Sequence, residues 1–361
     1  MSDTAAMPKW ALSTPIVALA LAGAAFALPG HGSLLAAAAV ALFGAVLAAV
    51  HHAEVVAHRV GEPFGTLILA VAVTVIEVAL IVSMMLAGGP DKPALPRDTI
   101  FSAIMIICNG AVGLCLLVGG IKHHEQTFRL EGATSALAAL IALSTLSLVL
   151  PAFTTTTPGA TYSTSQMAFA GVVSLVLWAV FVFVQTVRHR DYFLPPAGTA
   201  DESAHAAPPT VARAWFSFAL LLASLVAVIG LAKALSPSIE RAIASAGAPP
   251  AVIGIAIALL VLLPETWAAV RAARADRLQT SLNLALGSAL ASIGLTIPAV
   301  ALASFVLGMP LQLGLAPKDL VLLALTFAVG AITLGTGRTN VLQGAVHLVI
   351  FAAFLFLSLV P

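Results

Sequence analysis

Residues 61–65 read Gly-Glu-Pro-Phe-Gly, and an apolar run from Thr66 to Ala87 follows them. A helix of about 20 apolar residues is long enough to cross the ~30 Å hydrocarbon core of a bilayer. One acidic residue, Glu77, stands near the middle of this run, which holds no basic residue. A charged side chain at the bilayer centre costs roughly 2.5–3.5 kcal/mol on insertion scales. We therefore expect Glu77 to be protonated, to face a water-filled cavity, or to bind a cation.

The same pattern occurs once more, in the second half of the chain. The apolar run from Pro249 to Val270 carries Glu265 as its one acidic residue, again near mid-span and again without a basic residue. Ionisable residues inside transmembrane segments usually mark ion or proton pathways. Glu77 and Glu265 are therefore the first candidates for a functional site.

The composition indicates one polytopic membrane protein. Of 361 residues, 60% are hydrophobic and 9% are charged, and the mean hydropathy is +1.08. Soluble domains have about 25% charged residues. Sixteen basic and fifteen acidic residues leave no basic excess for binding a nucleic acid. The lipid bilayer is the expected surrounding, no hydrophilic segment is long enough for a receptor or scaffold domain, and the sequence leaves the oligomeric state open.

Charge and turn clusters cut the chain into eleven apolar runs, so we predict an all-α fold with about eleven transmembrane helices. The predicted spans are 10–29, 33–57, 63–87, 99–121, 132–151, 165–187, 213–235, 249–272, 280–307, 319–336 and 341–360. Lys and Arg are enriched in cytoplasmic loops. With a cytoplasmic N-terminus and a periplasmic C-terminus, eleven basic residues lie inside and five outside, which favours this orientation.

The spans predict an internal repeat. We expect residues 1–32 to form an extra N-terminal transmembrane helix, with a signal peptide as the alternative. Residues 33–187 and 213–361 then hold five spans each, joined by a polar cytoplasmic linker, 188–212. Because five is odd, the second set enters the membrane from the opposite face, as in transporters whose ion sites lie at the midplane between inverted repeats. Glu77 and Glu265 fall on the second span of their sets, at similar predicted depth.

Oxygen-bearing groups accompany both glutamates. Pro264 removes one hydrogen bond of its helix and is expected to free carbonyls near Leu260, beside Glu265. The polar side chains predicted to bind the cation with the two glutamates are Thr74, Asn109, Asn283, Ser288 and Ser292. Oxygen ligands suit hard cations such as Ca²⁺. The predicted metal site is therefore a pair of carboxylates with hydroxyl, amide and carbonyl oxygens around it.

Two buried carboxyl groups that share a site hold protons when no metal is bound, and a divalent cation would displace those protons. Occupation of one site by either protons or a cation is the thermodynamic basis of exchange. We therefore expect a secondary transporter that needs no cofactor, rather than an enzyme. The simpler alternative is that each glutamate is a protonated packing residue.

A multipass membrane metalloenzyme is the second functional hypothesis. It would use clusters at the predicted cytoplasmic helix ends, formed by His51, His52, Glu54 and His58 and by His123, His124 and Glu125. The sequence contains no His-Glu-x-x-His motif. Neutralising the glutamates or replacing the histidines would distinguish the two hypotheses.

Three stretches resemble the ChaA-type cation/proton antiporters of the calcium/cation antiporter superfamily. They are HRVGEPFGTLIL at 58–69 with Ile-Glu-Val at 76–78, SLNLALGS at 281–288, and GRTNVLQGAVHL at 337–348. The resemblance extends over nearly the whole chain from Val50 onward. It implies an extra first helix before two inverted five-helix repeats, in a bacterial-type inner membrane. It also implies export of Ca²⁺ in exchange for H⁺ by alternating access, with Na⁺ and K⁺ as further cations of ChaA-type members.

The resemblance implies roles for single residues. The glutamate of the superfamily's Gly-Asn-x-x-Glu signature maps onto Glu77 and Glu265, whereas Thr74 and Leu262 stand at the Asn positions. Residues of the shared stretches expected at an entrance or gate are Glu62, Arg338, Asn340 and His347. The alternatives are a topology anchor for Arg338 and a packing or hydrogen-bonding role for His347.

Overall fold

The computed structural model describes residues 7–28, 30–61, 64–88, 92–195 and 208–360. The predicted all-α membrane fold is confirmed, because eleven helical segments within these ranges are long and apolar enough to cross a bilayer. The chain divides into two compact units, Met1–Lys92 with Glu202–Gly247, and Pro93–Asp201 with Ala248–Pro361. Each unit is therefore built from two separate parts of the sequence.

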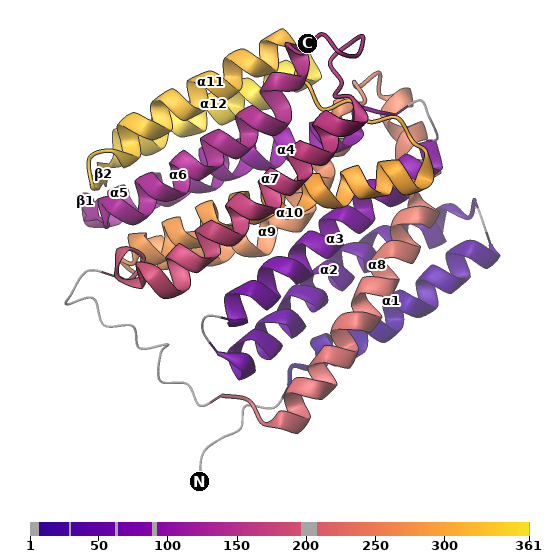
Figure 1. Cartoon of the computed structure of the whole chain (residues 1–361). Coiled ribbons are helices and arrows are strands. Elements are labelled where there is room, and N and C mark those ends of the chain that lie inside the picture. Colours follow the sequence, from indigo (N-terminus) through magenta and orange to yellow (C-terminus); the bar gives the residue numbers. More distant parts are fainter. Residues whose placement is uncertain (1–6, 29, 62–63, 89–91, 196–207, 361) are drawn as a thin grey trace. The chain divides into compact units, whose positions relative to one another are not determined.

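The first unit contains four long helices, which lie side by side in Figure 1. They are α1 (Lys9–Ala27), α2 (Gly32–Val60), α3 (Phe64–Gly88) and α8 (Val211–Ser245). These helices pack on one another and bury alanines such as Ala18 on α1 and Ala45 on α2. Small residues let helix backbones approach closely inside a membrane, where lipid leaves little hydrophobic drive for helix association.

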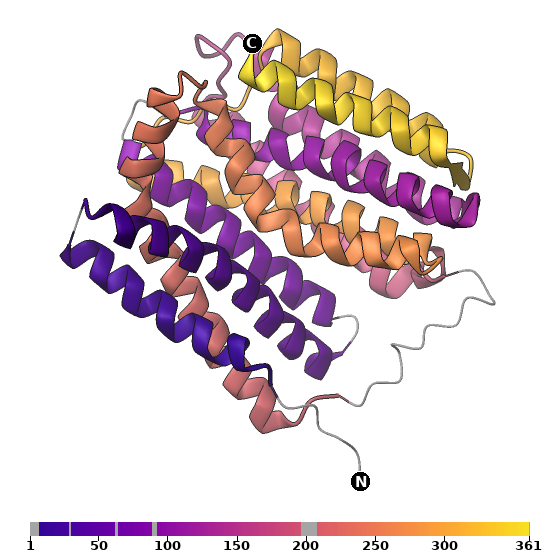
Figure 2. The same cartoon turned by 180° about the vertical axis from the view of Figure 1, so that it is seen from behind.

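The second unit contains the remaining elements. They are α4 (Leu95–Met105), η2 (Ile106–Ala111), α5 (Val112–His123), β1 (Glu125–Thr127), α6 (Leu130–Ser144), η3 (Thr145–Val149), η4 (Leu150–Ala152), α7 (Thr164–Phe183), η5 (Val184–Arg188), η6 (Arg190–Tyr192), α9 (Ala251–Arg274), α10 (Leu278–Leu307), α11 (Pro317–Leu334), β2 (Arg338–Asn340) and α12 (Val341–Leu359). Helix α9 packs on α4, α5 and α10, and α12 packs on α5. Figure 2 shows the yellow α12 lying along the purple α5.

Three spans of the second unit contain a π-helical turn, at η2, η3 and η5. The turn η2 joins α4 to α5 within one continuous span, Leu95–His123. A π-turn inserts an extra residue into an α-helix and occurs frequently at functional sites. The apolar run of the sequence predicted this span but not the turn inside it.

The stretch Gly337–Asn340 forms a turn, a short strand and a helix cap. Strand β2 pairs with β1 in antiparallel register, with Gln126 opposite Thr339. Gly337 has φ 70°, a conformation that glycine adopts without steric cost. The side chain of Asn340 then accepts from Leu342 N–H at 3.0 Å and caps α12.

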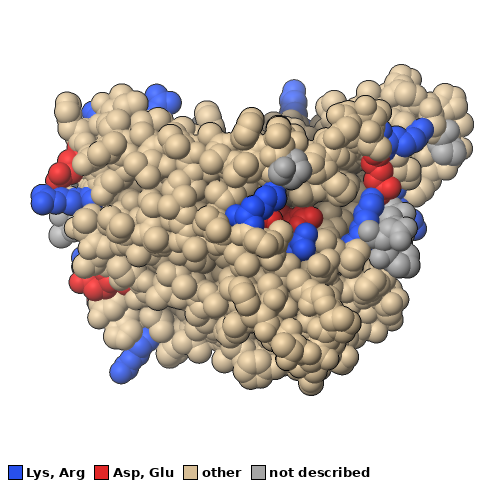
Figure 3. Space-filling view, turned by 90° about the horizontal axis from the view of Figure 1, so that it is seen from above, with Lys and Arg blue, Asp and Glu red and all other residues tan. Residues whose placement is uncertain are grey.

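The surface agrees with a membrane-embedded protein. On the face drawn in Figure 3, uncharged residues predominate and charged side chains stand in small groups. Large apolar side chains are widely exposed, among them Val40 (74%), Ile332 (72%) and Leu342 (70%). Apolar surface of this extent marks an interaction surface, as expected of a multi-pass membrane protein.

Candidate functional site

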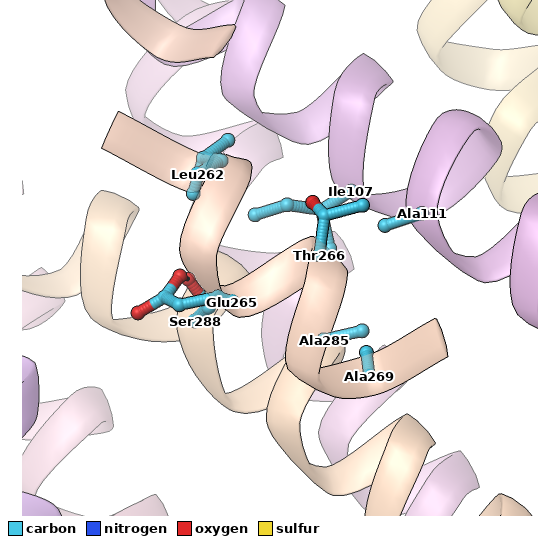
Figure 4. Close-up of a pocket in the computed structure, with 8 residues that line it drawn as sticks. All are labelled: Ile107, Ala111, Leu262, Glu265, Thr266, Ala269, Ala285 and Ser288. Atoms are coloured by element: carbon cyan, nitrogen blue, oxygen red, sulfur yellow. Dashed lines mark hydrogen bonds between the residues drawn. The ribbon is translucent and has the colours of Figure 1, made fainter. Parts of the chain in front are cut away.

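The site in the second unit begins with Glu265 on α9. Ser288 on the neighbouring helix α10 donates a hydrogen bond from its hydroxyl to Oε2 of Glu265. The carboxylate is only partly buried, and Figure 4 shows it beside Ser288. The sequence places both residues near the middle of their apolar spans, so the structure brings together two of the predicted site residues.

This pair lines a small hollow. It is lined by Ile107, Ala111, Leu262, Glu265, Thr266, Ala269, Ala285 and Ser288. The polar lining residues are Glu265, Ser288 and Thr266, and Figure 4 shows Ile107 of η2 next to Thr266. Apolar walls strengthen electrostatic interactions inside the hollow, because the local dielectric constant is lower than that of water.

Pro264 lies inside α9, which continues through it from Ala251 to Arg274. Proline has no backbone N–H, so the carbonyl of Leu260 receives no hydrogen bond from residue 264. The helix is thus uninterrupted at Pro264 and is not broken there.

Glu77 belongs to the first unit. It lies on α3 and its side chain is 2% exposed. Thr74 precedes it by three residues, is also buried, and therefore shares its helix face. Glu77 and Thr74 thus lie on one buried face of α3.

The other predicted cation ligands lie on α10 and η2. Ser292, one turn after Ser288, is buried. Asn283 donates to the carbonyl of Phe193 at 2.6 Å and accepts from Gln279 at 2.9 Å. Asn109 bonds to residues of α11 and α12 instead of lining the Glu265 hollow. The structure therefore brings Ser288 to Glu265, and it places both amides elsewhere in the second unit.

The residues predicted at an entrance or gate have separate surroundings. Arg338 is exposed and lies 3.7 Å from the carboxylate of Glu125. Asn340 caps α12, as described above. His347 is buried on α12 and contacts Asn109 and Thr333. Glu62 lies outside the described residues.

The histidine cluster at 123–125 lies at the C-terminal end of α9. Lys122 donates to the carbonyl of Arg274 at 2.8 Å, and Nε2 of His123 lies 3.0 Å from the same oxygen. Gln126 donates to the carbonyl of Ala273 at 3.0 Å. Polar and basic side chains satisfy the terminal carbonyls of a helix in this way. Within the described ranges, no group of three or more His, Cys, Asp and Glu residues could hold a metal ion.

The chain is similar to known ion transporters over most of its length. The family model of the sodium/calcium exchanger protein matches residues 31–187 and 216–360. The y4hA protein of Sinorhizobium fredii is 53% identical over 296 residues, covering 82% of this chain and 80% of that protein. The sodium-potassium/proton antiporter ChaA of Escherichia coli is 38% identical over 293 residues, covering 80% and 79%. The crystal structure of the Ca²⁺/H⁺ antiporter YfkE has the same fold, with a TM-score of 0.72 at 15% identity over 97% of this chain and 99% of that one.

Proposed function

This chain belongs to the sodium/calcium exchanger protein family, and we propose that it is an antiporter that exchanges an inorganic cation for protons. The resemblance to ChaA-type antiporters is confirmed by the identity with ChaA over most of both chains. Family and relatives are transporters, so the metalloenzyme hypothesis receives no support. The proposal rests on one structural observation: Glu265 and Ser288 meet at the wall of a small, largely apolar hollow between three membrane spans.

The exchange step follows from the chemistry of a partly buried carboxyl group. When protonated, Glu265 is neutral and compatible with its apolar surroundings. A cation that enters needs the ionised carboxylate, so binding of the cation releases the proton. Ser288 orients the carboxylate in both states, since a hydroxyl both donates and accepts hydrogen bonds. Cation and proton therefore exclude one another at the same oxygens.

We further propose that Glu77 and Thr74 of α3, and Ser292 of α10, also bind the exchanged ions. Support comes from the position of both glutamates at the same place of two five-span sets and from the burial of Glu77. Alternating access would then expose the bound ions to each side of the membrane in turn. Two carboxylates balance the charge of one Ca²⁺ or two monovalent ions.

The donor set selects the class of cation. Carboxylate, hydroxyl and carbonyl oxygens bind hard cations such as Ca²⁺, whereas soft metals prefer sulfur ligands. Relatives are named for Na⁺, K⁺ and Ca²⁺. We propose Ca²⁺ as the exported ion, with Na⁺ or K⁺ as alternatives, and transport across a bacterial inner membrane with a cytoplasmic N-terminus. The basic residues Lys122, Arg274 and Arg338 support this orientation, because they follow or precede spans on the side predicted to be cytoplasmic.

The proposal is tested by ion-driven proton movement in everted membrane vesicles. A preset pH gradient should collapse when Ca²⁺, Na⁺ or K⁺ is added to vesicles that contain the wild-type protein. The variant Glu265→Gln should abolish this response, whereas Glu131→Gln, at an exposed position on α6, should leave it intact. Wild-type vesicles that respond to none of the three ions, or a full response from Glu265→Gln, would contradict the proposal.

A further inference from the structure

A buried polar network in the second unit lies outside the proposed exchange chemistry. The ring of His347 is 2% exposed, and its Nδ1 lies 3.1 Å from Oδ1 of Asn109. Its Nε2 lies 3.2 Å from Oγ1 of Thr333. The amide of Asn109 donates to Oγ1 of Thr326 at 2.9 Å. The network therefore connects α12, η2 and α11.

Thr326, at the end of the network opposite His347, determines the direction of its hydrogen bonds. The hydroxyl of Thr326 donates to the carbonyl of Leu322 at 2.7 Å, so its oxygen is left to accept from the amide nitrogen of Asn109. The amide oxygen of Asn109 then faces His347. Because an amide oxygen only accepts, Nδ1 of His347 carries the hydrogen, and the hydroxyl of Thr333 can donate to Nε2. Every contact is satisfied, as burial requires.

Glycines let α12 come close enough for this contact. A Cβ atom added at Gly113 on α5 would lie 2.9 Å from Cβ of His347. A Cβ atom at Gly344 on α12 would lie 2.8 Å from Cα of Leu117. Both distances are shorter than any relaxed carbon–carbon contact. The backbones of α5 and α12 therefore contact each other directly. This close approach lets His347 reach Asn109, which lies about one turn before Gly113.

The opposite side of η2 forms a wall of the Glu265 hollow. Asn109 lies between Ile107 and Ala111, and both of these line the hollow. A π-turn is rare within an α-helix, so we expect contacts around η2 to hold it in place. The bond from His347 to Asn109 is one such support. Without it, the buried amide oxygen would be unsatisfied, and relaxation of η2 would move Ile107 and Ala111 against α9.

We propose that His347 is a positioning residue of the exchange site, which holds η2 through Asn109 and thereby sets the width of the hollow beside Glu265. This inference rests on the proposed function of Glu265. The width of the hollow affects how closely oxygen ligands surround a cation, and so it affects both affinity and the choice between smaller and larger ions. His347 itself does not contact the cation.

A matched pair of variants tests this role. Asn at position 347 places its side-chain nitrogen where Nδ1 of His347 lies, so His347→Asn keeps the donor to Asn109. Gln instead places its nitrogen near the position of Nε2, so His347→Gln keeps polarity and size but loses that donor. In proteoliposomes, His347→Gln should raise the apparent KM for the cation by about three- to tenfold, as expected for the loss of one neutral hydrogen bond. For His347→Gln, Vmax should stay within about twofold of the wild-type value, and the preference between K⁺ and Ca²⁺ should shift. His347→Asn should restore the wild-type KM.

A second measurement does not depend on transport. Cys108 is a buried free thiol within η2, so its labelling by a maleimide reports opening of the turn. In a Cys115→Ala background, His347→Gln should label faster than wild type, and His347→Asn should not. Equal KM values and equal labelling rates in the two variants would overturn the inference, even with full wild-type flux. Absence of wild-type flux would instead refute the proposed function, while the labelling still reports whether His347 holds η2.

Discussion

Ser288 of α10 donates a hydrogen bond to the carboxylate of Glu265 on α9. This contact joins the middle of two membrane spans and sets the orientation of the carboxylate within its hollow. Glu265 is one of the two glutamates that first indicated a functional site. Ser288 belongs to the stretch 281–288, which carries part of the family resemblance. The pairing makes Ser288 the first residue to test besides the glutamate itself.

Replacement of Ser288 by alanine should weaken cation binding. A hydrogen bond to a charged group contributes roughly 1.5–3 kcal/mol, so we expect the apparent KM for the cation to rise by about tenfold or more. Cation-driven proton flux in vesicles measures this change. Ser304→Ala is the matched control, because Ser304 lies on the same helix but donates to the carbonyl of Met309 near its end. Equal KM values for both variants would argue against the Ser288 contact.

Helix α12 should tolerate no side chain at position 344. In Gly344→Ala the new Cβ atom would press on the backbone of α5, which can move only by separating the helices. Overpacking of this kind costs about 1–3 kcal/mol, and thermal unfolding of purified protein should show a lower Tm. Gly23→Ala on α1 is the control, since nothing lies within 4 Å of its added Cβ. That variant should keep or raise Tm, because alanine favours a helix over glycine by roughly 1 kcal/mol.

The stretch Arg338–Asn340 allows a comparison of two polar contacts. Asn340 caps α12, and loss of an N-cap side chain costs about 1 kcal/mol. Arg338 and Glu125 form an exposed ion pair, and such pairs contribute about 0–1 kcal/mol. We therefore expect Asn340→Ala to lower the Tm more than Arg338→Gln does. The reverse order would show that the ion pair, rather than the cap, holds this end of α12.

Tyr162 lies in the connection before α7, and its hydroxyl donates to the carbonyl of Leu146 at 2.6 Å. Burial raises the pKa of the Tyr162 phenol above its ordinary value. The folded state therefore retains this proton better than the unfolded state, whose phenol titrates near pH ~10. The resulting stability is complete below that pH and is lost as the pH rises through the folded pKa.

Tyr162→Phe removes the phenol, so the variant should not show this loss of stability at alkaline pH. The difference in Tm between wild type and variant should be largest at neutral pH and should shrink toward pH ~11. Thermal unfolding over this pH range measures it. A constant difference at all pH values would contradict a raised pKa of Tyr162 in the folded protein.

Much of the fold follows from one physical rule that the sequence displays directly. Apolar runs long enough to cross a bilayer must be helical, because lipid cannot satisfy backbone polar groups. The eleven predicted spans are confirmed for this reason. The sequence also allows a contact between Glu265 and Ser288 to be predicted, since both lie well inside consecutive apolar spans.

The remaining features depend on contacts between distant residues. Helical spacing puts Asn109 and Asn283 on defined faces, but it does not say which neighbour those faces meet. Asn109 meets His347, 238 residues away, and Asn283 meets Phe193. The π-turn η2 and the pairing of β1 with β2 also arise from such contacts, so no local pattern predicts them. The glycines at positions 113 and 344 are the sequence feature that indicates a close approach of α5 and α12.

In the exchange proposed above, protons and a cation compete for the carboxylates of Glu77 and Glu265. Proton release from purified protein in weakly buffered detergent solution, on addition of Ca²⁺, Na⁺ or K⁺, measures this competition without any transport step. We predict that the wild type acidifies the solution on addition of the exported ion, and that Glu77→Gln and Glu265→Gln each lose most of this release. Wild-type levels of proton release from both variants would contradict this competition.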